Sequence, residues 1–435
     1  MKDFSVTSPQ CLSGEAFLPG DKSISHRAVM IASISDGSVE VNHFLRSDDC
    51  LRTVECMRSL GIDVKEEEDR LIVKGKGLNG LKRPKDILYV GNSGTSIRLL
   101  LGILAGQGFR STITGDESIK RRPMTRVVKP LSLMGAKLKG RGKENLAPVT
   151  VEGTKLKPIE YTLPVASAQV KSAILLAGLF AAGKSVVIEK TKTRDHTERM
   201  LEHFGARIEI HGDRIILHGS HALSAPSIDV PADISAAAYL MVAATLVPGS
   251  DVLLKSVGMN PGRVGIIDVL HRMGANIEVS SERIMSAEPV ADIRIKSARL
   301  KGVEISGGVI PRIIDEIPII ALAATQAEGE TAIRDAQELR VKESDRITTT
   351  SKELARLGGS VKELRDGMVV KGRRPLKGAE CQSYGDHRIA MMCAVAGLLV
   401  KGKTVVKKVD CVDTSFPGFA DTVNSLASSK CVEII

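Results

Sequence analysis

Polar and basic residues gather where the sequence passes from a loop into an apolar, helix-like stretch. The most charged of these places are residues 22–27 (KSISHR), 315–316 (DE) and 385–388 (GDHR). Ser, Asn and Asp cap the free N–H groups at a helix start, whereas Lys or Arg there opposes the helix macrodipole. Basic side chains beside these N–H groups therefore indicate that an anion binds at the helix start.

Six apolar stretches open with a polar cluster of this kind. The cluster at 233–235 (DIS) contains no basic residue, so capping alone is its favoured interpretation. The others carry charge or several hydroxyl and amide groups, which capping does not require. The six clusters are residues 22–27, 92–96, 167–169, 233–235, 315–316 and 385–388.

Further basic residues lie in three loops that precede amphipathic stretches, at 120–123 (KRRP), 194–196 (RDH) and 340–346 (RVKESDR). Each loop alone is typical of a solvated charged segment. Together with the helix starts and a formal net charge of +10, the loops predict a cleft more positive than one phosphate requires. Asp315 and Glu343 are acidic exceptions, which makes them candidates for proton transfer; internal ion pairing is the alternative.

The elements that must position these residues repeat about every 70 residues, in six units. In the first unit we predict a buried helix over 28–34, a strand over 38–41, an amphipathic helix over 51–60, and strands at 62–64 and 71–73. Each buried helix stops at a glycine, and each amphipathic helix closes on a large apolar residue followed by glycine or, once, alanine. Short strands that alternate with helices favour a mixed α/β fold.

Six units divide naturally into two domains of three. A strand-like stretch at 15–18 precedes the first unit, and the sixth unit runs out at 431–435 before its last strand. We therefore expect residues 1–19 to complete the last unit, with domains at 20–228 and at 1–19 plus 229–435. An open solenoid is the alternative, but long units with fully apolar helices fit closed pseudo-threefold cores better.

Composition narrows the class of protein. The net charge of +10 favours acidic partners, but aromatic residues make up only 3% and Trp is absent, which disfavours nucleic acid and favours small anions. Seven scattered cysteines have no metal-ligand spacing, so we expect reduced thiols and no metal. The N-terminus lacks an apolar targeting core and the apolar runs are too short for a bilayer, so we expect a cytoplasmic protein.

Two glycine-rich matches are interpreted as decoys. Residues 178–185 fit the P-loop pattern GxxxxGK[ST], but they end a helix-like stretch and precede a strand. A P-loop needs the opposite order, so that helical N–H groups point at phosphate. Residues 75–80 fit GxGxxG, but LKRP follows instead of a helix. We predict no nucleotide site at either place.

Four segments in order, residues 18–27 (LPGDKSISHR), 91–95 (GNSGT), 340–346 (RVKESDR) and 385–391 (GDHRIAM), resemble the signatures of the 5-enolpyruvylshikimate-3-phosphate (EPSP) synthase family. The resemblance covers essentially the whole chain. It implies an inside-out α/β barrel of two pseudo-threefold domains that close on their substrates. It also implies transfer of the enolpyruvyl group of phosphoenolpyruvate to shikimate 3-phosphate, with release of phosphate and no cofactor. We expect a monomer.

The resemblance also assigns site residues. Glu343 and Asp315 would transfer protons, and Lys22 would stabilise charge or relay a proton. Which carboxylate serves which step stays open. The residues implied for shikimate 3-phosphate are Lys22, Ser23, Arg27, Ser167, Ala168, Gln169, Arg194, Asp315 and Lys342. Those implied for phosphoenolpyruvate are Lys22, Gly94, Arg122, Gln169, Arg346 and Arg388.

Some positions depart from the commonest pattern of the family. Ala168 stands where a second Ser often follows Ser167, and Glu338 where Asn is common. Asp413 replaces a Lys that often precedes the segment matching Thr414-Ser415-Phe416-Pro417. The resemblance therefore does not assign substrate contacts to that segment. These departures, with Arg194 in residues 193–196 (TRDH), resemble the less common, class II-like subclass.

Two rival interpretations remain. A sister family transfers enolpyruvate to UDP-N-acetylglucosamine, but its members usually carry Cys in the loop that matches 116–122, where this chain has none. A basic nucleic-acid-binding repeat protein would spread its charge over a surface with aromatic platforms. Here the basic residues recur at helix starts, so the EPSP synthase resemblance is preferred.

Overall fold

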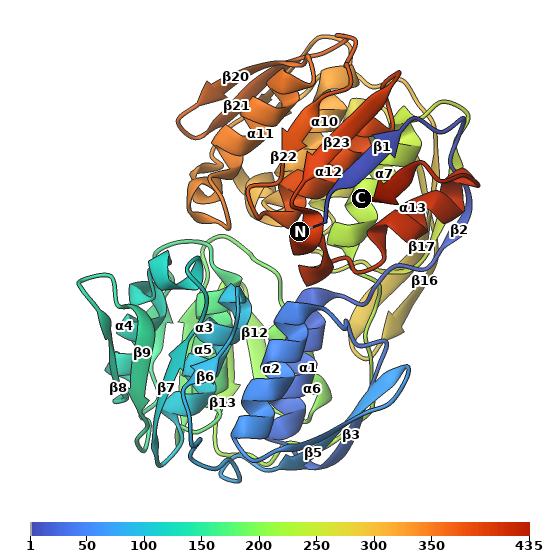
Figure 1. Ribbon diagram of the computed structural model, residues 1–435. Helices are drawn as coiled ribbons and strands as arrows, with labels where there is room; N and C mark the ends of the chain where they lie inside the picture. The colour runs from blue at the N-terminus through green and yellow to red at the C-terminus, as the bar shows by residue number, and fades with distance from the viewer. Residues whose placement is uncertain (1) are drawn as a thin grey trace. The chain divides into compact units, whose positions relative to one another are not determined.

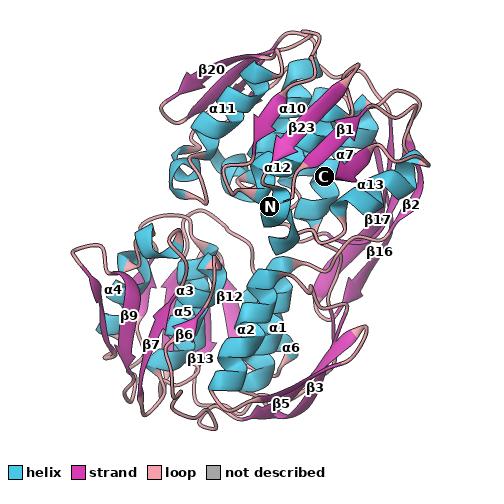
Figure 2. Cartoon of the chain, viewed as in Figure 1, coloured by secondary structure: helices cyan, strands magenta, loops and turns pink. Residues whose placement is uncertain are grey.

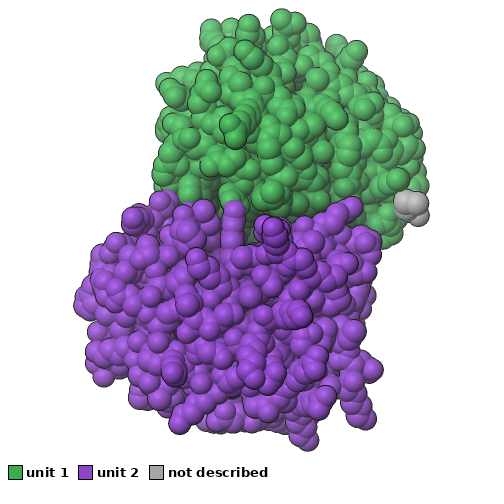
Figure 3. All heavy atoms as spheres, turned by 90° about the vertical axis from the view of Figure 1, so that its left-hand side faces the viewer, with its two compact units in different colours: residues 1–19, 231–283, 289–435 green, residues 20–230, 284–288 purple. Residues whose placement is uncertain are grey.

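The computed structural model describes residues 2–435, which form two compact units (Figure 3). Unit 1 consists of the residues up to Pro19, Pro231–Arg283 and Pro289–Ile435; unit 2 consists of Gly20–Val230 and Ile284–Glu288. The chain passes from unit 2 to unit 1 at 230/231, whereas the sequence predicts this boundary at 228/229. The short segment 284–288 belongs to unit 2, although it is distant in sequence from the rest of that unit. That each unit folds as an independent domain stays a prediction.

Unit 2 contains six α-helices and twelve strands among its described residues. Its helices are α1 (Lys22–Ser33), α2 (Asp48–Ser59), α3 (Gly94–Ala105), α4 (Thr125–Leu133), α5 (Ala168–Gly178) and α6 (His196–His203), with one 3₁₀ turn, η1 (Ile119–Arg121). Its strands are β3 (Asp36–Asn42), β4 (Asp63–Glu66), β5 (Arg70–Lys76), β6 (Leu88–Tyr89), β7 (Arg110–Thr114), β8 (Lys137–Arg141), β9 (Leu146–Glu152), β10 (Glu160–Thr162), β11 (Lys184–Ile188), β12 (Ile208–His211), β13 (Arg214–His218) and β14 (Ile228–Asp229).

Unit 1 repeats this plan with the remaining elements. Its helices are α7 (Ile234–Leu246), α8 (Gly265–Met273), α9 (Ile310–Ile313), α10 (Ile317–Gln326), α11 (Arg346–Arg356), α12 (His387–Gly397) and α13 (Phe419–Ala427), with η2 (Gly307–Val309), η3 (Gln337–Val341) and η4 (Val409–Thr414). Its strands are β1 (Phe4–Thr7), β2 (Ser13–Ala16), β15 (Asp251–Gly258), β16 (Asn276–Met285), β17 (Glu288–Lys296), β18 (Glu304–Ile305), β19 (Glu330–Ile333), β20 (Ser360–Leu364), β21 (Gly367–Lys371), β22 (Glu380–Gln382), β23 (Lys403–Lys407) and β24 (Val432–Ile434).

The strands form six four-stranded sheets, which carry the repeat (Figures 1 and 2). In one sheet β14 pairs with β3 in parallel, and β3, β5 and β4 pair antiparallel. The sheets that begin with β6, β10, β18 and β22 have the same order of one parallel and two antiparallel pairings. The expected α/β fold class, with three repeated units in each half, is confirmed. The strand orders are β14-β3-β5-β4, β6-β7-β9-β8, β10-β11-β13-β12, β16-β17-β15-β2, β18-β19-β21-β20 and β22-β23-β1-β24.

Strands distant in sequence close each unit on itself. In unit 2, β14 lies at the end of the segment Gly20–Val230 and pairs with β3, which lies near its start. In unit 1, β1 lies between β23 and β24 and completes the sixth sheet. The prediction that residues 1–19 complete the last unit is right for β1 but wrong for β2, which pairs with β15 of the fourth sheet. Apolar alternation identifies a strand without naming its neighbour, which is why the pairing of β2 could not be foreseen.

Three helices in each unit are buried along most of their length: α1, α3 and α5 in unit 2, and α7, α10 and α12 in unit 1. Beyond the polar and charged residues near their N-termini, these helices are largely apolar on all sides, as expected of a helix with no face in water. In α7 every residue from Ile234 to Thr245 is buried. The amphipathic helices bury one side only; α8 ends at Gly274, whose φ of 95° suits glycine.

The two decoy motifs lie where the sequence places them. The P-loop-like residues begin at the last residue of α5, Gly178, and run into β11, so helical N–H groups do not point at this segment. The GxGxxG match begins at the end of β5, and a turn follows. Among residues 2–435, no helix has both the length and the apolar composition needed to cross a bilayer.

Candidate active site

The N-termini of α1, α3 and α5 meet inside unit 2. His26 of α1 lies 3.4 Å from the hydroxyl of Ser96 in α3, Nδ1 to Oγ. Gln169 of α5 donates from Nε2 to Oγ1 of Thr95 in α3, over 3.1 Å. The buried helices therefore bring the three polar clusters of this unit together, as their sequence positions predict.

Lys22 is the first residue of α1 and forms an ion pair with Asp49. The side chain of Lys22 is 20% exposed, so its ammonium group is accessible, whereas Asp49 is nearly buried. Asp49 lies in the first turn of α2, where the macrodipole favours a carboxylate. Arg194 Nη1 lies 3.4 Å from Ser23 Oγ, which places the basic loop at 194–196 against the start of α1.

Arg27 is buried, and its guanidinium group joins three parts of unit 2. Its Nε donates to Thr197 Oγ1 in α6 (2.7 Å), Nη1 to the carbonyl of Ser23 (2.9 Å), and Nη2 to Ser172 Oγ in α5 (2.8 Å). Burial, and after it the charge of Arg194, lower the pKa of Arg27 to about 10, so the group stays cationic at neutral pH. Arg27 thus holds α1 against α5 and α6 in addition to supplying positive charge.

Two guanidinium groups lie over Gly94, the first residue of α3. A Cβ atom at this position would lie 3.0 Å from Nη1 of Arg122 and 3.0 Å from Nη1 of Arg98. Nη2 of Arg122 donates to Asn92 Oδ1 (2.9 Å) and to Ser118 Oγ (3.0 Å), which fixes the guanidinium. Glycine therefore leaves room for an anion beside two cations and a helix N-terminus.

The start of α5 supplies the third part of this group of residues in unit 2. Ser167 is the N-cap and accepts a hydrogen bond from the backbone N of Val170 (3.4 Å); Ala168 and Gln169 follow it. Arg98 Nη1 donates to Gln169 Oε1 over 2.6 Å, so the amide and the cations at Gly94 form one connected group. Ala168 adds no hydrogen-bonding side chain to it.

In unit 1, Arg346 binds three carboxylates. Its Nη1 lies 3.1 Å from Asp315 Oδ1, its Nη2 lies 2.6 Å from Glu343 Oε2, and its Nε lies 2.8 Å from Asp386 Oδ2. Burial alone would lower the pKa of Arg346, but Asp386, Glu343 and Asp315 raise it well above its usual value. Arg346 is almost fully buried, whereas the side chains of Asp315 and Glu343 are 17% and 23% exposed, so the two carboxylates are the accessible members.

Lys342 adds a second cation to Asp315. Its Nζ lies 3.3 Å from Asp315 Oδ1, the same oxygen that Arg346 binds. Asp315 precedes the buried helix α10, and Lys342 lies between η3 and α11, so a contact within one unit of the repeat builds this pair. One carboxylate oxygen of Asp315 is thus held by two cations.

Arg388 lies at the start of α12, after the N-cap Asp386, which accepts a hydrogen bond from the backbone N of Arg388 (2.9 Å). Burial would lower the pKa of Arg388, but Tyr239, Asp315 and Glu316 raise it above its usual value. Within residues 2–435, its Nε has no hydrogen-bond partner. A buried N–H without a partner is costly, so Arg388 is suited to accept an external anion.

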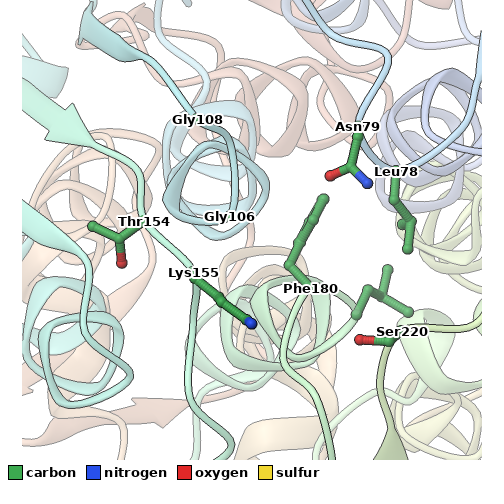
Figure 4. Close-up of a pocket in the computed structure, with 9 residues that line it drawn as sticks. Leu78, Asn79, Gly106, Gly108, Thr154, Lys155, Phe180 and Ser220 are labelled. Carbon is green, nitrogen blue, oxygen red and sulfur yellow. The ribbon is translucent and has the colours of Figure 1, made fainter.

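A cavity of about 410 Å³ in unit 2 lies away from all these residues (Figure 4). It is bordered by residues at the C-terminal ends of α3 and α5, including Gly106 and Phe180. Helix C-termini repel anions, and Lys155 is the one basic side chain in its lining. The cavity is therefore at the wrong end of the helices for the chemistry that the sequence predicts.

Among the described residues, one group could offer three ligand atoms to a metal ion, with Glu353, Cys381 and Cys393 within 4.8 Å of one another. The carboxylate of Glu353 already accepts hydrogen bonds from the Tyr384 hydroxyl (2.7 Å) and the backbone N of Gln382 (3.1 Å). The hydrogen bond to Cys381 and burial raise the pKa of the Cys393 thiol well above its usual value. The group fits a buried thiol pair better than a cation site, and the expectation of no metal stays a prediction.

Several residues of these networks, among them Arg98, Asp49 and Glu316, were not among the predicted site residues. Arg98 lies one helical turn after Gly94, and this i, i+4 spacing could have placed it on the same face. Asp49 occurs in an acidic first turn that capping explains equally well. Glu316 is adjacent to Asp315, but its contacts involve residues far away in sequence, for which the sequence carries no local signal.

Comparison with known proteins identifies the family. The family pattern of EPSP synthase (3-phosphoshikimate 1-carboxyvinyltransferase) matches residues 6–423. A 3-phosphoshikimate 1-carboxyvinyltransferase of Desulforamulus reducens is 54% identical over 416 residues, which are 95% of this chain and 97% of that protein. One of Bacillus cereus is 52% identical over 416 residues, 96% and 97% of the two chains.

Solved structures agree with these sequence relatives. EPSP synthase from Acinetobacter baumannii superposes with a TM-score of 0.89 at 43% identity over 100% of both chains. The enolpyruvyl transferase NikO from Streptomyces tendae has a TM-score of 0.81 over 100% of this chain and 98% of its own; at 17% identity it shows the fold alone. With a family match over nearly its full length and relatives above 50% identity, this chain belongs to the EPSP synthase family.

Proposed function

We propose that the two groups of residues described above carry the family's reaction in this chain. In that reaction the enolpyruvyl group of phosphoenolpyruvate passes to the 5-hydroxyl of shikimate 3-phosphate, and phosphate is released, in the biosynthesis of aromatic amino acids. The observation that supports this assignment most directly is the arrangement at Arg346, where one cation holds the carboxylates of Asp315 and Glu343. The reaction needs one group to deliver a proton and one to remove a proton.

The chemistry divides into addition and elimination. In the addition, C3 of phosphoenolpyruvate gains a proton, the 5-hydroxyl oxygen bonds to C2 and the hydroxyl proton leaves. In the elimination, the resulting tetrahedral species loses phosphate from C2 and a proton from its methyl group. We assign the proton at the methyl carbon to Glu343 and the hydroxyl proton to Asp315. Lys22 would stabilise the developing charge or relay a proton.

Both substrates are phosphorylated carboxylates, which gives the basic residues their purpose. Charge-assisted hydrogen bonds from Arg and Lys to such groups are about twice as strong as neutral ones. The assignment for shikimate 3-phosphate is Lys22, Ser23, Arg27, Ser167, Gln169, Arg194, Asp315 and Lys342, with Ala168 contributing only its backbone. The assignment for phosphoenolpyruvate is Lys22, Gly94, Arg122, Gln169, Arg346 and Arg388.

The cation pair over Gly94 supports its assignment to phosphoenolpyruvate. Arg122 and Arg98 leave the space of one side-chain atom at this helix start, which an oxygen of a phosphate or carboxylate can occupy. The Nε of Arg388, which has no hydrogen-bond partner among residues 2–435, is a second donor available to an anion.

Two finer expectations belong to this proposal. We place the enzyme in the cytoplasm, because its substrates are small charged metabolites that do not cross membranes unaided. We also propose that it works as a monomer. Light scattering coupled to size-exclusion chromatography tests the second point, and a mass near twice 46.5 kDa would contradict it.

A direct assay tests the function. Phosphate release from phosphoenolpyruvate is measured with shikimate 3-phosphate, with UDP-N-acetylglucosamine, and with neither acceptor. We expect release with shikimate 3-phosphate alone. Release with UDP-N-acetylglucosamine instead would assign the chain to the sister reaction. Mass spectrometry of the acceptor product then checks that the three carbon atoms of the enolpyruvyl group were gained.

A further inference from the structure

A buried chain of polar groups in unit 1 connects residues 233–235 to Arg388. From the sequence, these residues were expected only to cap a helix. Ser235 Oγ accepts a hydrogen bond from Arg263 Nη2 (2.6 Å) and donates to Glu316 Oε1 (2.5 Å). Arg263 Nη2 also donates to Asp233 Oδ1 (3.0 Å). Arg388 completes the chain, since its Nη1 lies 3.8 Å from Glu316 Oε1 and 3.5 Å from the carbonyl oxygen of Ser235.

Helix capping does not explain Glu316. It occupies the N-cap position of α10, but its side chain accepts no capping hydrogen bond from that helix. It is only 2% exposed, and burial of a carboxylate is costly unless cations or donors compensate it. Its compensation comes from Ser235 and Arg388, which belong to α7 and α12. The residue thus connects the N-termini of all three buried helices of unit 1.

Few contacts determine where the guanidinium group of Arg388 points. Its Nε has no hydrogen-bond partner among residues 2–435, and Nη1 makes one long hydrogen bond to Ser235. Nη1 also forms an ion pair with Glu316, which is held in turn by Ser235 and, through it, by Arg263. Attraction to this fixed carboxylate therefore helps to direct the guanidinium group, together with the charge of Asp315, which likewise raises the pKa of Arg388.

We propose that Glu316 is a positioning residue of the transfer reaction: it aims Arg388 at phosphoenolpyruvate, and Ser235 and Arg263 hold it in place. The inference rests on the proposed role of Arg388. Glu316 itself touches no substrate in this scheme. The cluster at 233–235 then serves the reaction from a distance, in addition to capping α7.

Two opposing effects set the sign of the expected result. Removal of the Glu316 charge makes the region more positive, which favours an anion. It also frees Arg388 to leave the direction in which it binds. The second effect should be larger, because Arg388 contacts the anion directly, and a misplaced contact can cost far more than a remote charge adds. A fall in KM for phosphoenolpyruvate would overturn the proposal.

The first test replaces Glu316 by Gln, which keeps the shape of the side chain and removes its charge. We expect KM for phosphoenolpyruvate to rise about tenfold, with KM for shikimate 3-phosphate changed by less than about twofold. Glu353→Gln is the matched control, since Glu353 is also fully buried in unit 1 but lies outside the Arg388 chain. The Glu353→Gln substitution should leave KM for phosphoenolpyruvate unchanged, even if it lowers the melting temperature as much as Glu316→Gln does.

A double-mutant cycle separates this inference from the proposed function. If Arg388→Ala alone leaves KM for phosphoenolpyruvate unchanged, the role assigned to Arg388 is wrong. If Arg388→Ala raises KM but Glu316→Gln does not, the positioning role of Glu316 is wrong. We expect Glu316→Gln to add less than about twofold in the Arg388→Ala background, because its effect passes through that side chain. Full additivity of the two changes would also refute it.

Ser235→Ala provides an independent test if Glu316→Gln does not fold. It removes the hydroxyl that joins Arg263 to Glu316 and leaves both charges in place. The same selective rise in KM for phosphoenolpyruvate is expected. An equal rise for both substrates would indicate general damage to unit 1 and would contradict the proposal.

Discussion

Arg346 and Asp315 lie 3.1 Å apart, from Nη1 to Oδ1, and the other terminal nitrogen of the same guanidinium group binds Glu343. A guanidinium group is planar and rigid, so it fixes the two carboxylates relative to each other. Asp386 holds Arg346 from the buried side, and the N-cap role of Asp386 anchors the arrangement to α12. One cation thus orients both groups to which we assign proton transfer.

Asp315→Asn should lower kcat far more than it raises KM for shikimate 3-phosphate, because the amide can still form hydrogen bonds. The amide keeps the size of the side chain but cannot accept the proton of the 5-hydroxyl, and general base catalysis contributes about 10²–10⁴-fold. We expect a fall in kcat of at least about a hundredfold, measured by phosphate release at saturating substrates. Asp268→Asn, on an exposed residue paired with Arg312, is the control. A kcat within about threefold of the native value would rule out Asp315 as the base.

Glu343→Gln should suppress proton exchange at the methylene carbon. In deuterium oxide the reversible addition step carries deuterium into phosphoenolpyruvate recovered before completion, and proton NMR follows it. We expect the exchange rate to drop at least about a hundredfold. The control is Glu363→Gln, because Glu363 is a more exposed carboxylate that pairs with Arg340 in the same unit. Unchanged exchange would assign the methyl proton to another group, with Lys22 the first candidate.

The repeat, the buried helices and the residues at their N-termini could be predicted because their causes are local. Capping preferences, apolar composition on all sides and charge against the macrodipole are properties of a few neighbouring residues. Lys22, Arg27 and Arg388 were singled out in this way, whereas Gly94 was assigned through the family resemblance. Arg98 shows the limit of the method: it shares a helix face with Gly94, but the surface that this face meets depends on packing.

Contacts over long sequence separations could not be predicted. Arg27 bonds Thr197, which is 170 residues away, and Ser235 bonds Glu316, which is 81 residues away. Each depends on how the units of the repeat pack, which no local pattern specifies. The pairing of β2 with β15 belongs to the same class. The capping expected of residues 233–235 is present, and the further partners of these residues, Arg263 and Glu316, are distant in sequence for the same reason.

Gly94→Ala should weaken the binding of phosphoenolpyruvate without affecting the fold. The new Cβ would lie 3.0 Å from Nη1 of both Arg98 and Arg122, tighter than ordinary contact, so the two guanidinium groups must shift by a few tenths of an ångström. It would also occupy the space assigned to an oxygen of the anion. We expect KM for phosphoenolpyruvate to rise about tenfold, with KM for shikimate 3-phosphate within about twofold.

Gly108→Ala is the matched control for that substitution. Gly108 follows the other end of α3, and nothing lies within 4 Å of a Cβ built there. It should leave both KM values and the melting temperature nearly unchanged. Equal KM values for phosphoenolpyruvate in the Gly94→Ala and native enzymes would contradict the assignment of the anion to this helix start.

Protonation of His26 should make unit 2 less stable in mild acid. The imidazole is fully buried among Thr53, Ser93 and Ser96. Burial, with Lys22 and Arg27 adding to it and Asp21 opposing, lowers the pKa of His26 well below its usual value. Between that value and about 6.5 the unfolded chain binds a proton that the folded chain does not, so stability falls as pH falls, by at most about 1.4 kcal/mol per pH unit.

The measurement compares urea unfolding of native and His26→Gln proteins between about pH 5.5 and 7.5, a window below which carboxylates begin to titrate. Gln can still exchange hydrogen bonds with the neighbouring hydroxyls but does not titrate. We expect the native protein to lose stability with falling pH more steeply than His26→Gln, whatever the offset between them. His211→Gln, on an exposed residue, should retain the native slope. Coincident slopes for native and His26→Gln would mean that His26 is charged, or unburied, in the folded state.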